Sequence, residues 1–205
     1  MELTDQQMDA LRELGNIGAA HAATTLSTML NTTIDMNIPD ISVIDLSHVH
    51  EHISDEIAAM VLFKIDGELS KGGYLLLHVP VKSAIGLVNA MLGMEDLTRP
   101  MDEMDESALL EIGNIMVSAF LDGTAGLLNV IMIPSPPGLV IDMPHAALQG
   151  IIAMQLEGND NEVVLFRTEL KSSDYSLESD LILLPDRLLL EELIQKLEQV
   201  LTLHQ

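Results

Sequence analysis

Apolar side chains recur every three or four positions along residues 8–30, a spacing that predicts an amphipathic helix with one face against a core. Thr4 followed by Gln7 is typical of a capping box, in which each side chain satisfies a free backbone N–H at the start of a helix. Asn31 suits a left-handed cap at the other end. We therefore expect the chain to open with a long helix between Thr4 and Asn31.

The same pattern returns in residues 106–129, at a constant spacing of 98 positions. Asp102, 98 positions after Thr4, is the expected cap of this second long helix. Polar and proline positions keep the spacing as well: Asp9 and Ser107, Glu13 and Glu111, Asn16 and Asn114, Pro39 and Pro137. An internal duplication is the simplest account. We predict a single domain over residues 1–205, made of a first repeat, 1–98, and a second repeat, 99–205.

Three polar side chains of each repeat share one side of the predicted helix. Asp9, Glu13 and Asn16 are separated by four and then three positions, so all three leave the same face. The second repeat keeps this spacing. A single Glu-x-x-Asn on a helix surface is usually only solvated, but a copied pattern of exposed polar residues indicates a function, because packing alone would not fix it. Both polar faces are expected to point outward.

Runs rich in β-branched and apolar residues predict strands over residues 41–47, 58–65, 74–79, 130–133, 139–143, 150–157, 162–170 and 180–184. Shorter helices are expected over residues 81–92, ended by Gly93, and over residues 185–201, opened by Pro185. The predicted fold class is α+β. Two pseudo-symmetric halves, each with a long helix, strands and a closing helix, would share a mainly antiparallel sheet and leave the two motif helices exposed.

Composition and charge narrow the class of partner. Hydrophobic residues make up 48% of the chain, but aromatic residues only 2%, so no aromatic platform is available for single-stranded nucleic acid. A formal net charge of −23 repels phosphate backbones and anionic lipid, which argues against nucleic acid and membrane surfaces and favours a protein with a basic face. The chain has no cysteine, its start is unlike a signal peptide, and no apolar run reaches the roughly 20 residues of a membrane span. A cytoplasmic protein is expected.

The duplicated motif resembles a known signature. The order Asp or Ser, Glu, Asn and a downstream Pro, at the spacing seen here, is similar to that of the CheC, CheX and FliY phosphatases of bacterial and archaeal chemotaxis. The resemblance extends over essentially the whole chain and is strongest to the CheC branch, because both copies of the motif are complete. The chain departs from the common form GNIGAGNAAT at Ala20 and His21.

This resemblance implies an enzyme that hydrolyses the aspartyl phosphate of the response regulator CheY. A neutral amide donates and accepts hydrogen bonds without bringing negative charge to a phosphoryl group, so we assign the orientation of the attacking water to the two asparagines. The glutamates would contact a basic residue beside the phosphorylation site. The assigned roles are catalytic for Glu13, Asn16, Glu111 and Asn114, auxiliary docking for Asp9 and Ser107, and structural, in the turn after each long helix, for Pro39 and Pro137.

Other interpretations stay open. The chain could be an adaptor that binds phosphorylated CheY, CheD or flagellar switch components without hydrolysis. The resemblance implies CheD as a second partner, for which Asp142 in residues 139–143 is one weak candidate contact. A buried or strand-edge role for this segment is an alternative of at least equal weight. His48, His50 and His52 would share a face for a metal if extended, but a solvated loop is the stronger interpretation. No metal is expected on this chain; Mg²⁺ would arrive with the regulator. The internal pseudo-symmetry favours a monomer.

Overall fold

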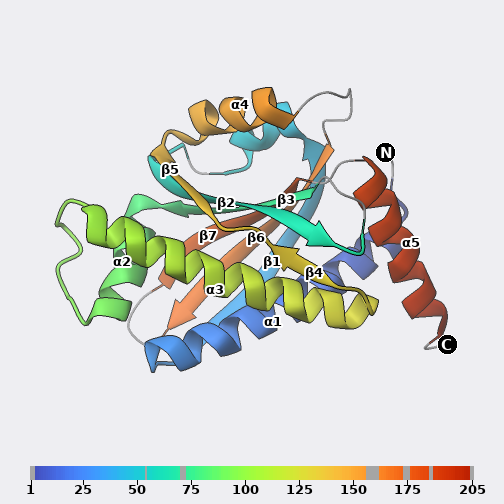
Figure 1. Ribbon diagram of the computed structural model, residues 1–205, viewed down its shortest axis with the longest axis horizontal. Coiled ribbons are helices and arrows are strands. Elements are labelled where there is room, and N and C mark those ends of the chain that lie inside the picture. Colours follow the sequence, from blue (N-terminus) through green and yellow to red (C-terminus); the bar gives the residue numbers. More distant parts are fainter. Residues whose placement is uncertain are drawn as a thin grey trace.

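The computed structural model describes residues 3–53, 55–69, 73–155, 162–172, 176–184 and 187–203 (Figure 1). The helices are α1 (Asp5–Leu30), α2 (Val81–Leu92), α3 (Glu103–Leu128), α4 (Pro144–Gln155) and α5 (Arg187–Leu203), with a 3-10 helix, η1 (Leu46–Glu51). The strands are β1 (Ile34–Asp45), β2 (Ala58–Gly67), β3 (Gly73–Pro80), β4 (Met132–Pro134), β5 (Gly138–Asp142), β6 (Glu162–Ser172) and β7 (Ser176–Leu184). The predicted α+β class is confirmed. Pro185, the expected start of the last helix, lies outside the described residues.

The two long helices, α1 and α3, begin and end in the same way. Thr4 caps α1 in a capping box, and Asp102 caps α3 in a second box that Asp105 completes. Each helix stops at an asparagine in the left-handed conformation, Asn31 with φ 50° and Asn129 with φ 51°. Asparagine tolerates this conformation better than other residues with a side chain. The caps predicted at Thr4, Asn31 and Asp102 are confirmed.

The strands form one seven-stranded sheet in the order β1, β6, β7, β3, β2, β4, with β5 also paired to β2. Every pairing in this sheet is antiparallel. The hairpin of β6 and β7 lies between β1 and β3, although it comes much later in the chain. Strands from both predicted repeats therefore belong to the same sheet.

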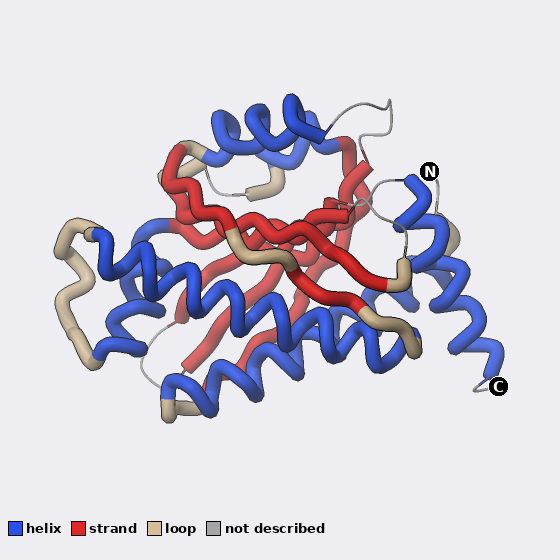
Figure 2. The backbone as a smooth tube through the Cα atoms, in the orientation of Figure 1, coloured by secondary structure: helices blue, strands red, loops and turns tan. Residues whose placement is uncertain are grey.

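Helices cover both faces of the sheet, as Figure 2 shows. The larger core lies on the face that carries α1, α2, α3 and α5, where strand residues such as Val61, Phe63 and Leu75 are fully buried. The opposite face carries η1 and α4 over a smaller cluster that includes Met60 and Leu76. The alternation of side chains along β2 and β3 thus supplies both cores. The motif helices α1 and α3 rest on the larger one.

By length and composition alone, α3 passes as a candidate membrane span, with a mean hydropathy of 1.2 over its most apolar window. However, 67% of that window is buried inside the protein. The larger core therefore accounts for the apolar character of this helix.

The strand predicted over residues 150–157 is wrong, because residues up to Gln155 belong to α4. This helix starts at Pro144, a position where proline costs no hydrogen bond and already has a helical φ. Leu148 is 3% exposed and packs in the smaller core. A short apolar run fits a strand and a buried helix equally well, and the preceding Pro144 was the signal that distinguishes them.

The two motif prolines lie among strands. Pro39 falls within β1, where the pairing with β6 shifts register between Asn37 and Asp40, rather than in a turn after the helix as expected. Proline cannot donate to a ladder, and such an irregularity is where a strand tolerates it. Pro137 lies between β4 and β5, which pair with successive parts of β2. Each proline thus coincides with a break in regular pairing.

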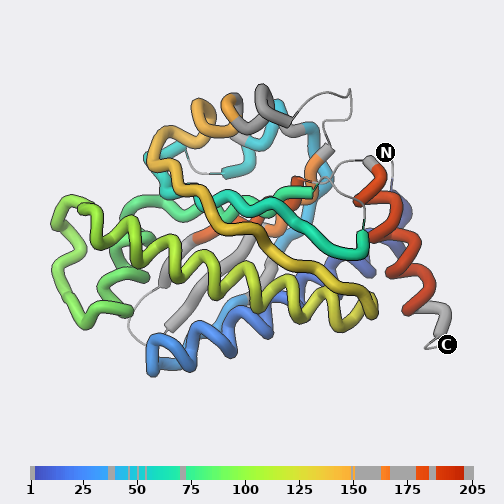
Figure 3. The backbone as a smooth tube through the Cα atoms, viewed as in Figure 1, coloured from blue at the N-terminus to red at the C-terminus, as the bar shows by residue number. Residues whose placement is uncertain are grey.

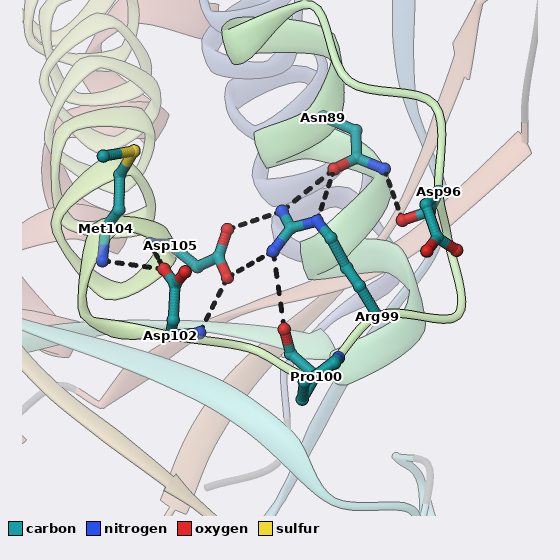
Figure 4. Close-up of polar contacts among 7 residues, drawn as sticks. All are labelled: Asn89, Asp96, Arg99, Pro100, Asp102, Met104 and Asp105. Carbon is teal, nitrogen blue, oxygen red and sulfur yellow. Dashed lines mark hydrogen bonds and ion pairs between the residues drawn. The ribbon is translucent and has the colours of Figure 1, made fainter.

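A polar network fixes the start of α3 to the end of α2 (Figure 4). Arg99, in the connection between the two helices, makes two hydrogen bonds of 2.6 Å to the carboxylate of Asp105. Asn89 on α2 accepts from the same guanidinium at 2.9 and 3.1 Å. The side chain of Asp105 is only 1% exposed, and the hydrogen bonds from Arg99 hold its pKa below the ordinary value of 3.8. The network therefore orients the helix that carries the second motif.

Arg99→Ala should lower the midpoint of thermal unfolding by roughly 5 to 10 °C, because it leaves a buried carboxylate without its cation. Arg12→Ala, which removes the exposed pair with Asp9 at 2.6 Å, should change the midpoint by less than about 2 °C.

Because the pKa of Asp105 is lowered in the folded protein, the ionised carboxylate stabilises the fold above pH 3.8, and this stabilisation is lost as the pH falls through the lowered pKa. The difference between parent and Arg99→Ala should therefore shrink in acid. Equal effects of the two substitutions at neutral pH would contradict this account.

Candidate functional site

The first motif lies on the outer face of α1. Asp9, Glu13 and Asn16 are all exposed, whereas Leu11 and Leu14, between them in the sequence, are buried at 0% and 3% exposure. The helical period therefore separates the two kinds of side chain as the sequence predicts. The motif carboxylates and amide of α1 face away from the core.

The second motif has the same arrangement on α3. Ser107 and Glu111 are exposed and Asn114 is half-buried, while Ile112 and Met116 are buried at 1% and 2% exposure. The two motif faces are therefore alike, but Asn114 is less exposed to solvent than Asn16.

The glutamates and asparagines of both motifs differ from the auxiliary residues in their hydrogen bonding. The carboxylate of Asp9 accepts a hydrogen bond from Arg12 at 2.6 Å, and the hydroxyl of Ser107 donates to the backbone oxygen of Glu103 at 3.0 Å. Within the part of the chain that the structure describes, no hydrogen bond or ion pair engages the side chains of Glu13, Asn16, Glu111 or Asn114. These four groups are available to a partner.

Close packing of α1 against α3 sets the positions of the two motifs. The helices lie side by side and run in opposite directions, as the colours in Figure 3 show. A Cβ on Gly18 would lie 2.6 Å from the ring of Phe120, and one on Gly113 would lie 3.2 Å from Val61. Two small residues thus let α1 approach α3 and let α3 approach the sheet.

A hollow of about 310 Å³ opens between α1 and α3 beside Asn114. Its polar lining comes from both helices: His21 and Thr25 of α1, and Asn114, Ser118 and Asp122 of α3. The sequence analysis missed this hollow. The one local signal was the departure at Ala20 and His21 from the common form of the motif, but only the antiparallel pairing of the helices shows which α3 residues His21 meets.

The histidine segment does not form the extended face that a metal site would need. Residues 46–51 form η1, capped by Asp45, which accepts two hydrogen bonds from Ser47 at 2.5 and 2.8 Å. These hydrogen bonds lower the pKa of Asp45. Among the described residues, no three histidine or acidic side chains are grouped so that they could hold a metal ion.

Asp142 lies at the end of β5 and is exposed, with its carboxylate accepting from the backbone N–H of Met143 at 2.7 Å. Within the described sheet, β5 pairs only with β2. The segment 139–143 therefore has the strand-edge position that the sequence analysis gave as one alternative.

The profile of the CheC-like family matches residues 7–43 and 104–141, and each range holds one copy of the motif with its proline. The CheY-P phosphatase CheC of Bacillus subtilis is 30% identical over 192 residues, which cover 90% of this chain and 90% of that protein. The chain belongs to the CheC-like family. Another relative, the putative CheY-P phosphatase CheC1 of Halobacterium salinarum, is 27% identical to this CheC-like protein over 88% of the chain and 91% of its own length.

Solved structures of other proteins have a similar fold. FliY of Thermotoga maritima superposes with a TM-score of 0.81 at 22% identity, over 100% of both chains. The middle domain of FliM from H. pylori gives a TM-score of 0.72 at 12% identity, over 95% of this chain and 99% of that one. A chain of the CheX–CheY–BeF3–Mg²⁺ complex from Borrelia burgdorferi gives 0.52 at 15% identity, over 82% and 94%. These similarities concern the fold, and they agree with the predicted CheC-like arrangement.

Gly18→Ala should lower the free energy of unfolding by about 1 to 3 kcal/mol, because the added methyl group overpacks the contact with Phe120. Gly126→Ala is the matched control on α3: no atom lies within 4 Å of the added Cβ, so stability should stay the same or rise by up to about 1 kcal/mol. Denaturant unfolding measures both. A Gly18→Ala protein as stable as the Gly126→Ala protein would show that the two helices do not need the glycine.

Proposed function

We propose that this protein is a phosphatase that removes the phosphoryl group from the phosphorylated aspartate of a CheY-type response regulator. The observation that carries the proposal is the pair of Glu and Asn side chains, one turn apart, on the outer faces of both α1 and α3 of a CheC-like protein. All four lack partners among the described residues, and all are exposed except Asn114, which is half-buried. The names of its relatives, CheY-P phosphatases, support the same substrate.

In this mechanism the amides of Asn16 and Asn114 each orient a water in line with the bond that breaks. The water oxygen bonds to phosphorus while the bond from phosphorus to the aspartate oxygen breaks, and a water proton passes to the released phosphate. An amide suits this position because it binds water without adding negative charge beside the phosphoryl oxygens. Positioning of this kind accounts for about 2 to 4 kcal/mol of the barrier.

Glu13 and Glu111 fix the orientation of the bound regulator by pairing with a basic residue beside its phosphorylation site. Each lies three residues before its asparagine on the same helix face, so a partner held by the carboxylate presents its phosphoryl group to the amide. Asp9 and Ser107 make auxiliary docking contacts with the regulator, at the edge of the surface that binds it.

Further parts of the proposal concern the setting of the reaction. We place the protein in the cytoplasm, as a monomer, where it meets the regulator and, as a second partner, CheD. The Mg²⁺ that neutralises phosphoryl charge belongs to the regulator, whose own acidic residues would hold it.

The double variant Asn16→Ala with Asn114→Ala should lose the accelerated dephosphorylation of the regulator, by a factor of about 30 to 1,000, while its unfolding midpoint stays unchanged. The measurement is phosphate release from the purified phosphorylated regulator. Gln6→Ala, an exposed carboxamide on α1 outside the motif, is the control and should keep full activity. A double variant with parental activity would refute the role of the asparagines. A parent that binds the regulator but releases no phosphate would favour the adaptor.

Glu13→Lys with Glu111→Lys should raise the KM for the phosphorylated regulator by at least about tenfold, because each replaces an attraction to a basic residue with a repulsion. The control is Glu95→Lys with Glu106→Lys, which changes the net charge equally at exposed positions outside the motifs. Steady-state kinetics at fixed ionic strength compares the two. Similar KM values for both double variants would mean that only the overall charge matters.

A further inference from the structure

We propose that the hollow beside Asn114 binds a basic side chain of the phosphorylated regulator, and that the two sites are therefore unequal. This inference rests on the proposed function and adds a recognition subsite at one of its two sites. The hollow, of about 310 Å³, has a polar lining of Asn114 itself, His21, Thr25, Ser118 and Asp122, and two apolar residues, Ile115 and Ala119, complete it. The amide that would orient the water and the groups that would bind the partner thus share one hollow.

The polar lining is suited to accept hydrogen bonds from a donor. Thr25 Oγ1 donates its own proton to the backbone oxygen of His21 at 3.0 Å, so its oxygen remains as an acceptor. Asp122 is an exposed carboxylate with no ion-pair partner within the described ranges. The imidazole of His21 makes no hydrogen bond with the described residues either. A lysine or arginine side chain brings several donors for these acceptors and a positive charge for the carboxylate of Asp122.

The corresponding place beside Asn16 has a different chemistry. At the spacing of 98 positions, Asp122 corresponds to Thr24, Ser118 to Ala20, and Thr25 to Gly123. The Oγ1 of Thr24 donates to the backbone oxygen of Ala20 at 2.8 Å. The Asn16 site therefore has one hydroxyl oxygen where the Asn114 site has a carboxylate and two hydroxyls.

The ring of His21 adds a steric difference between the two sites. A Cβ on Gly123 would lie 2.9 Å from Cγ and Cδ2 of the ring, so the imidazole is packed directly over Gly123. Gly123 corresponds to Thr25, which lines the hollow beside Asn114. His21 therefore lines the hollow beside Asn114, and its ring also packs over the residue that corresponds to Thr25.

The test uses two single-site proteins, Asn16→Ala, which keeps the Asn114 site, and Asn114→Ala, which keeps the Asn16 site. For each we measure kcat and KM for phosphate release, and the Kd for the regulator loaded with BeF3 and Mg²⁺. The protein that keeps the Asn114 site should have the lower KM, by about three- to tenfold, with a kcat within about twofold of the other. Equal KM values, or a lower KM for the Asn16 site, would overturn the proposal.

Asp122→Asn should raise the KM and the Kd of the Asn114 site by about three- to tenfold and change those of the Asn16 site by less than about twofold. Thr24→Asp, which places a carboxylate at the corresponding position, should lower the KM of the Asn16 site. The contribution of Asp122 to KM and Kd should shrink as salt rises from about 0.05 to about 0.5 M, because a charge pair is screened and a packing effect is not.

His21→Ala should raise the KM and the Kd of the Asn114 site only, and His21→Gln should restore most of the lost affinity.

Equal effects of Asp122→Asn at both sites, or no effect at either, would overturn the subsite. The Kd measurement distinguishes a failure of the subsite from a failure of the proposed phosphatase function. If the parent binds the loaded regulator but releases no phosphate, the phosphatase fails while the Kd values still decide the subsite. If the parent does not bind the loaded regulator, both are wrong.

Discussion

Both sites of the protein depend on the contact between α1 and α3. The two helices lie antiparallel on one face of the sheet, and Gly18 leaves the room that the ring of Phe120 occupies. Gly113 lets α3 pack closely on Val61 of β2, although with more room than Gly18 has. The inner faces of both helices are buried in this packing. The opposite faces, which carry Glu13 and Asn16 on α1 and Glu111 and Asn114 on α3, therefore point outward. The same contact creates the hollow that neither helix could form alone.

The protein has far fewer basic than acidic side chains, and this imbalance determines the charge of its surface. The chain has 9 Lys and Arg against 32 Asp and Glu. Among the described residues, Arg12 pairs with Asp9, Lys64 with Asp66, and Arg99 with Asp105. Few basic groups remain to neutralise the motif carboxylates. The acidic surface of α1 and α3 is thus available to a basic partner, while the buried pair at Asp105 holds the second motif helix in place.

Features set by neighbouring residues could be predicted from the sequence, and features set by distant contacts could not. The long helices, their caps at Thr4, Asn31 and Asp102, and the exposure of the motif glutamates all follow from local spacing. The error at residues 150–157 arose because a short apolar run does not distinguish strand from buried helix. The place of Pro39 in β1, the order of the sheet and the hollow at Asp122 all depend on pairings between remote segments.

The insertion of the hairpin of β6 and β7 between β1 and β3 has a consequence for how the protein is made. Ile34 at the start of β1 pairs with Ser172 of β6, so this part of the sheet cannot close until the residues up to Ser172 have left the ribosome. Pairings between such distant segments form slowly, because a large loop must be ordered before any contact stabilises it. During synthesis, α1 and β1 therefore emerge before β6, the neighbour of β1 in the sheet, has been made.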